Sequence, residues 1–145
     1  MNADGLFVYG SLRSGGSRHA WLERTHPEGR CCAWTPGRLF HLPTGDAALV
    51  PGLEPEAPPP GPGWVLGEFV GFEDEEGLDA ALADLDPLEG VEEELYLRRA
   101  VPVLLDGAQR FVAWAYLFPD DRLPRLAREA LELPSGDWSS YLDEG

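Results

Sequence analysis

The chain has 145 residues, 11 basic and 26 acidic side chains, and a formal net charge of −15 at pH 7. That length and a hydrophobic content of 43% predict a single globular domain over residues 1–145 with its own apolar core. The acidic balance excludes nucleic acid and membrane surfaces as expected partners, because both bind proteins through Lys and Arg. Every basic residue is an arginine, so neither a Schiff-base lysine nor a P-loop lysine is available.

The start of the chain predicts a strand, a glycine-rich loop and a helix. Residues 6–9 are apolar and β-prone and stop at Gly10, which indicates a buried strand that runs into a turn. Ser17 suits an N-cap, and residues 18–24 suit a short helix.

Residues 30–50 predict two or three short strands, interrupted at Pro36-Gly37 and followed by a turn at 43–46. Cys31 and Cys32 are adjacent, so they form neither a C-x-x-C redox pair nor a set of zinc ligands. We expect them to be buried free thiols in a reducing cytoplasm.

The middle of the chain predicts a long loop, a strand and a helix. Residues 51–63 hold six prolines and three glycines, a composition typical of an irregular loop within a domain. Residues 64–72 predict a strand, after which leucines recur at helical spacing. We expect that helix to end at Glu89, with Gly90 as its left-handed cap.

Residues 95–105 and 111–118 predict an antiparallel pair, and 123–133 a last short helix before a short polar C-terminal tail. Strands outnumber helices, and most connections are too short for parallel crossovers. We therefore expect an α+β domain whose mixed, mostly antiparallel sheet curls into a small β-barrel with a few external helices.

Two motifs suit chemistry. In V-Y-G-S-L-R-S-G-G at 8–16, a strand ends in a glycine turn whose backbone N–H groups can bind a carboxylate or an oxyanion. The same pattern also fits an ordinary tight turn.

In L-D-P-L-E-G-V at 85–91, Glu89 stands at the negative end of a helix among other acids. The helix dipole and the nearby negative charges both raise the proton affinity of its carboxylate, as a general base needs. A solvated acidic turn is the alternative for Glu89.

The remaining polar and aromatic residues give weaker signals. The three histidines, His19, His26 and His41, lack metal-ligand spacing, so no metal is expected. Ser11 lacks the G-x-S-x-G context of a hydrolase nucleophile. The strand tryptophans are expected in the core, and Tyr116 is retained as a pocket-lining residue.

Taken in order, the motifs resemble the gamma-glutamyl cyclotransferase-like family, closest to its short bacterial members and its gamma-glutamylamine cyclotransferase branch. The matching segments are F-V-Y-G-S-L-R-S-G-G-S-R-H at 7–19, G-R-L at 37–39, V-L-G-E-F at 65–69, L-D-P-L-E-G-V at 85–91, Tyr96 with Arg98-Arg99, and S-G-D-W at 135–138.

This resemblance implies the barrel fold of that family and an enzyme that converts a gamma-glutamyl amine or peptide into 5-oxoproline and a free amine. It implies Glu89 as general acid/base, with no metal or other cofactor. The residues that it implies for substrate binding are Tyr9, Gly10, Ser11, Leu12, Tyr96 and Tyr116.

An alternative is a non-catalytic module that keeps the pocket and binds a small metabolite. The net charge opposes an anionic substrate, so either the substrate is close to neutral or cationic, or local groups attract it. The groups considered are the turn N–H groups, Arg13, Arg18, Arg98 and Arg99. No signal peptide precedes the first strand and no apolar run approaches the ~20 residues of a membrane span, so a soluble cytoplasmic protein is expected.

Overall fold

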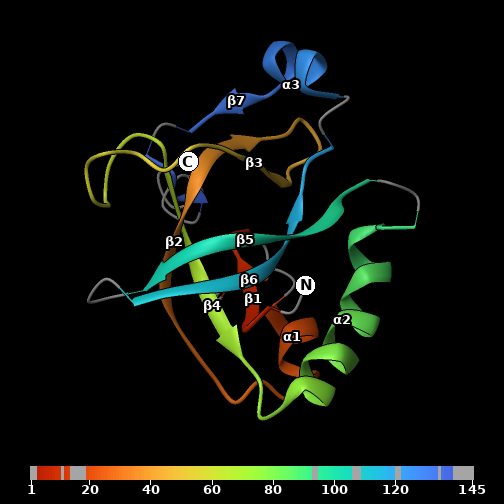
Figure 1. Cartoon of the computed structure of the whole chain (residues 1–145). Helices are drawn as coiled ribbons and strands as arrows, with labels where there is room; N and C mark the ends of the chain where they lie inside the picture. The colour runs from red at the N-terminus through yellow and green to blue at the C-terminus, as the bar shows by residue number, and fades with distance from the viewer. Residues whose placement is uncertain are drawn as a thin grey trace.

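The structure is a computed structural model, and it describes residues 3–10, 12–13, 19–92, 95–105, 109–119, 122–133 and 135–138, apart from the side chains of Leu123 and Ala127. The predictions for Ser11, Ser17, Arg18 and the C-terminal tail therefore lie outside the described residues. The elements in chain order are β1 (Gly5–Val8), α1 (His19–Glu23), β2 (Gly29–His41), β3 (Ala47–Pro51), β4 (Trp64–Gly71), α2 (Glu75–Glu89), β5 (Leu97–Leu105), β6 (Gln109–Leu117), α3 (Leu123–Glu129) and β7 (Leu131–Glu132) (Figure 1).

Five of these strands close into a barrel. They pair in the order β2-β4-β1-β6-β5, and β5 pairs back with β2 at Ala33 and Trp34. Within this described set β1 and β6 run parallel, and the other neighbours run antiparallel. The predicted mixed, mostly antiparallel barrel with external helices is confirmed.

Strand β2 is continuous where the sequence predicted an interruption. Pro36 pairs with Trp64 at the start of β4, and the next residue, Gly37, pairs with Pro51 at the end of β3. The Pro-Gly pair thus lies where β2 leaves the barrel and enters a second small sheet with β3 and β7. A proline, which has no N–H to donate, is tolerated at such a junction between two ladders.

The Pro-rich segment is a loop, as predicted, and side chains tie it to the barrel. The indole Nε1 of Trp64 donates to Ala57 O at 2.9 Å. Arg110 in β6 pairs with Glu54, and Arg110 Nη2 lies 2.9 Å from Glu54 Oε2.

The last helix is shorter than predicted, because it ends at Glu129 and Leu131–Glu132 pairs with β2 as strand β7.

Helix α2 lies along one side of the barrel, beside α1 (Figure 1). The Asp74 side chain caps its start by accepting a hydrogen bond from Gly77 N at 2.8 Å. Leucines on one face pack against the apolar residues of β1, and Leu85 is 1% exposed. Gly90 follows with φ 69° and ψ 36°, so the predicted left-handed cap is confirmed.

The two cysteines correct the sequence prediction of burial, since both are exposed. They lie in the first part of β2, which pairs with β4 opposite Phe69 and Glu68. The pairing of β2 with β5 begins only at Ala33, so the closed barrel does not cover the residues before it.

No helix in the described residues is both long and apolar enough to cross a membrane.

The approach of β1 to β4 requires a glycine at position 67. A Cβ atom there would overlap the carbonyl oxygen of Val8 and lie 2.6 Å from the ring of Phe7, whereas a Cβ on Gly71 of the same strand would meet nothing within 4 Å. We predict that Gly67→Ala lowers the free energy of unfolding by about 1–3 kcal/mol, the usual cost of overpacking. Urea unfolding measures it, with Gly71→Ala as the matched control. Equal stability of the two variants would contradict this account.

Candidate functional site

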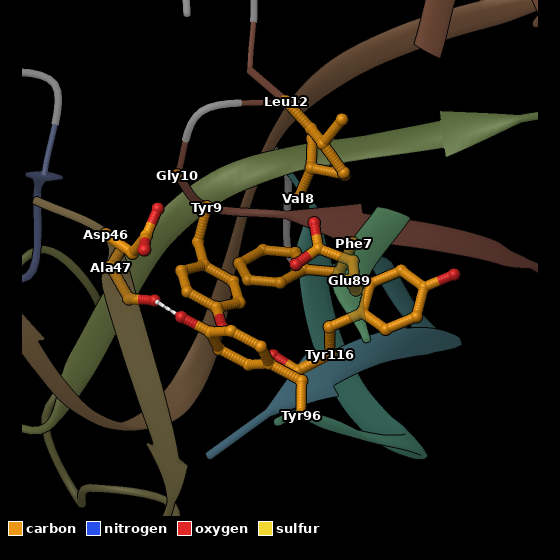
Figure 2. A pocket seen from close by; sticks show the side chains of 10 residues that line it. All are labelled: Phe7, Val8, Tyr9, Gly10, Leu12, Asp46, Ala47, Glu89, Tyr96 and Tyr116. Carbon is orange, nitrogen blue, oxygen red and sulfur yellow. Dashed lines mark hydrogen bonds between the residues drawn. The ribbon is translucent and has the colours of Figure 1, made fainter. Parts of the chain in front are cut away.

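A cavity of about 40 Å³ lies where β1 ends, next to the last turn of α2 (Figure 2). It brings together the segments that the sequence singled out, although they are about 80 residues apart along the chain. Its lining residues are Phe7, Val8, Tyr9, Gly10, Leu12, Asp46, Ala47, Glu89, Tyr96 and Tyr116.

Strand β1 delivers the turn to this cavity. All four of its residues are buried, because it is paired on both sides, with β4 and with β6. After it the chain turns, and Arg13 N donates to Gly10 O at 3.0 Å. A Cβ on Gly10 would lie 3.0 Å from Cβ of Ala47, so glycine allows the turn to approach the start of β3 closely.

Glu89 is the last residue of α2, and its half-buried side chain lines the cavity. Figure 2 shows its carboxylate among the side chains that line the cavity. The end of β1, the turn after it and the end of α2 therefore meet at one cavity. Six of the residues that the resemblance implied line it: Tyr9, Gly10, Leu12, Glu89, Tyr96 and Tyr116. Ser11 lies outside the described residues, and the chemical roles of all these residues stay predictions.

Tyr9 is buried at the base of the cavity, and its hydroxyl donates to the carbonyl oxygen of Tyr116. Burial raises the pKa of Tyr9 well above its ordinary value, and the nearby Tyr96 and Glu89 raise it further. The phenol therefore stays neutral and serves as a fixed wall.

The other two tyrosines also direct their hydroxyls to protein acceptors. Tyr116 OH donates to Asp86 Oδ1 at 2.7 Å and points away from Glu89 in Figure 2. Burial, and then the hydrogen bond to Asp86, raise the pKa of Tyr116. Tyr96 OH donates to Ala47 O at 2.7 Å. All three tyrosines thus present their rings to a ligand.

Asp86 joins the end of α2 to the barrel, a role that sequence reasoning missed. Its two carboxylate oxygens accept hydrogen bonds from Arg98 Nε at 3.0 and 3.2 Å, in addition to the bond from Tyr116. The Arg98 guanidinium in turn lies over the Trp114 ring, 4.8 Å from its centroid. The sequence suggested Asp86 only as a like charge near Glu89, whereas Arg98 compensates it.

Most of the arginines considered for substrate attraction have structural partners. Arg13 Nη1 lies 3.0 Å from Asp137 Oδ1, which ties the turn after β1 to the C-terminal S-G-D-W segment. Arg98 pairs with Asp86. Arg99 is exposed and donates to the Arg98 carbonyl.

Asp46 and Ala47 are lining residues that the motif analysis did not select. Asp46 ends the turn before β3 and Ala47 is the first residue of β3. Figure 2 places both across the cavity from Glu89. The available signal was their place at the end of the turn predicted at 43–46. Among the described residues, no group of three or more His, Cys, Asp or Glu side chains is arranged to hold a metal ion.

A protein-family model described as gamma-glutamyl cyclotransferase, AIG2-like, matches residues 6–140. The chain belongs to this family. The family predicted from the ordered motifs is therefore confirmed, and the gamma-glutamyl cyclotransferase-like family is an enzyme family. A search of curated protein sequences finds no match.

Solved structures agree with this gamma-glutamyl cyclotransferase-like assignment. YkqA from Bacillus subtilis is 25% identical with a TM-score of 0.61, and the match covers 97% of this chain and 41% of YkqA. An AIG2-like protein from Mus musculus is 20% identical with a TM-score of 0.58, over 85% of this chain and 84% of that one. A gamma-glutamyl cyclotransferase structure is 19% identical with a TM-score of 0.52, over 81% and 68%. The last two likenesses establish the shared fold, and this chain spans less than half of YkqA.

The buried tyrosines of this gamma-glutamyl cyclotransferase-like site predict a loss of stability at high pH. In the unfolded chain Tyr9 and Tyr116 ionise near pH 10, whereas the folded protein keeps them protonated above that pH. Their contribution to stability is therefore complete below about pH 10, and it falls as the pH rises further, by up to about 1.4 kcal/mol per pH unit for each tyrosine.

Urea unfolding at a series of alkaline pH values, together with ultraviolet absorbance of tyrosinate, checks this prediction. Tyr9 and Tyr116 should contribute to the absorbance only as the protein unfolds, and Tyr116→Phe should remove one residue's share of that late signal. Ionisation of every tyrosine near pH 10 in the folded protein would contradict the assignment.

Proposed function

We propose that this protein converts a gamma-glutamyl amine or peptide into 5-oxoproline and the free amine, with Glu89 as general base and then general acid. The observation that carries the proposal is the convergence of Glu89 with Gly10 and Leu12 on one cavity (Figure 2). A solvated acidic turn, the alternative interpretation of Glu89, does not account for its half-buried position in this cavity.

One carboxylate is sufficient for the proposed reaction. Glu89 accepts a proton from the substrate's α-ammonium group, and the free amine attacks the γ-carbonyl carbon to form the new C–N bond of the five-membered ring. The tetrahedral intermediate then collapses, the C–N bond to the leaving group breaks, and Glu89 returns the first proton to the departing nitrogen. The ring nitrogen gives up its second ammonium proton through the same carboxylate, and the amine leaves as an ammonium ion. Atoms balance without water or an external reagent.

The turn after β1 supplies the second requirement, a set of donors for negative charge. The backbone N–H groups of Gly10 and Leu12 are proposed to bind either the substrate's α-carboxylate or the oxyanion that forms on the γ-carbonyl. Gly10 suits this role because its missing side chain lets a ligand approach the backbone. The rings of Tyr9, Tyr96 and Tyr116 exclude water from the reacting atoms.

Glu89→Gln removes the proton acceptor and keeps the shape of the side chain. We expect 5-oxoproline release to fall at least about 100-fold, the usual scale of general acid–base catalysis, with thermal stability close to that of the wild type. The assay is chromatographic detection of 5-oxoproline from a panel of gamma-glutamyl peptides and amines.

Glu92→Gln is the matched control, because Glu92 is exposed and lies three residues further along the chain. It should keep full activity. Undiminished turnover by Glu89→Gln would exclude Glu89 as the base. Wild-type protein that binds the panel by calorimetry and yields no product would instead favour the non-catalytic, metabolite-binding module.

A further inference from the structure

A second and larger groove lies next to the catalytic cavity. Its volume is about 470 Å³, within the range of small-molecule sites, and it is bounded by α3, by the turn that precedes β3 and by the end of β6. The residues that matter for its chemistry are Leu42, Leu95, Phe118, Leu126, Arg122 and Arg125.

The groove and the catalytic cavity share a wall. Tyr96 lines the cavity, Phe118 lines the groove, and their rings meet edge to face with centroids 6.5 Å apart. Adjacent residues of the same segments also divide between the two: Leu95 borders the groove and Tyr96 the cavity, while the turn before β3 contributes Thr44 to the groove and Asp46 to the cavity.

The sizes of the two spaces assign them to different parts of a substrate. A single water needs roughly 10–15 Å³ of cavity, so the 40 Å³ beside Glu89 is too small to enclose a whole gamma-glutamyl compound, whose glutamyl half the proposed function places there. The amine half of a gamma-glutamyl compound must therefore extend beyond the catalytic cavity. The adjoining groove is large enough to receive it.

The lining of the groove indicates which amine fits. Its apolar part includes Leu95, which is 55% exposed and offers surface that a ligand can cover. Arg125 is neutralised by Glu129, with Nε 3.0 Å from Oε2. Arg122 forms no ion pair with any residue that the structure describes, so its guanidinium is the cationic group of this lining that a ligand can use.

We infer that this groove binds the leaving amine, and that the preferred substrate is a gamma-glutamyl amino acid or short peptide with an apolar side chain and a free carboxylate, which Arg122 binds. The inference rests on the proposed function and names its substrate class. It makes Arg122 a specificity-determining residue and disfavours a cationic leaving amine, which the net charge of the whole chain alone would favour.

Substrate pairs test the two halves of the inference. We expect kcat/KM for gamma-glutamyl-leucine to exceed that for gamma-glutamyl-glycine by at least about tenfold, because the groove covers the larger apolar side chain. Gamma-glutamyl-leucinamide, which lacks the carboxylate, should react about five- to tenfold less efficiently than gamma-glutamyl-leucine. Gamma-glutamyl-1,5-diaminopentane, whose leaving amine carries an ammonium group and no carboxylate, is the cationic comparison.

Arg122→Gln assigns the carboxylate preference to one residue. It should raise KM for gamma-glutamyl-leucine about five- to tenfold with little change in kcat, and leave gamma-glutamyl-leucinamide unaffected, which also shows that the variant is folded. Arg128→Gln is the matched control, since Arg128 is exposed on the same helix and does not line the groove. It should behave as the wild type.

The outcomes separate the inference from the proposed function. Turnover of the panel with no preference for gamma-glutamyl-leucine, a preference for gamma-glutamyl-1,5-diaminopentane, or the same loss for both leucine substrates in Arg122→Gln would overturn the inference and leave the proposed function intact. Burial of this groove in a stable dimer, seen by sedimentation and by protection from hydrogen exchange, would also overturn it. No 5-oxoproline from any substrate would overturn the proposed function itself and the inference with it.

Discussion

Helix α2 is held on the barrel by two interactions of different kinds, and the position of Glu89 depends on both. The buried leucines Leu78, Leu82 and Leu85 each contribute on the order of 1.5–3 kcal/mol through burial, so apolar packing decides that the helix docks. The Asp86 carboxylate is partly exposed and contributes less, but its hydrogen bonds with Tyr116 and Arg98 are directional. Packing thus supplies the stability, and Asp86 fixes the rotation of the last turn. Glu89 lies three residues further along the same helix, so the contacts of Asp86 also fix its position.

The end of α2 also shows what sequence reasoning can reach. Apolar spacing and Gly90 locate the helix end correctly, because both signals are local. The closed barrel likewise follows from short connections between many strands. The direction of the Tyr116 hydroxyl and the compensation of Asp86 by Arg98 depend on pairings between distant segments, which one sequence does not encode locally. Exposure of Cys31 and continuity of β2 through Pro36-Gly37 have the same origin, since both depend on where neighbouring strands stop.

Charge operates locally in this acidic protein. The net charge of −15 sets the electrostatic potential at a distance from the protein, and this negative potential slows the approach of anions. Within the site, Arg13 and Arg98 are paired with Asp137 and Asp86, so they stabilise the walls of the cavity and leave its centre to Glu89 and the turn. The rings of Tyr9, Tyr96 and Tyr116 line that centre beside Glu89. Under the proposed function, an acid that takes up and returns a proton benefits from such partly buried surroundings, because its charge is screened less than in bulk water.

The C-terminal segment 135–138 has a consequence for how the site forms. Gly136 takes a left-handed conformation against the Trp64 carbonyl and accepts a hydrogen bond from Leu66 N, while Trp138 donates to His41 at 3.2 Å. The same segment holds Arg13 through Asp137, across 124 residues of chain. The turn after β1 therefore meets its anchor only once all the segments between Arg13 and Asp137 have been synthesised and brought together. Contacts of such high sequence separation form late, so we expect the turn to reach its final order after the barrel has formed.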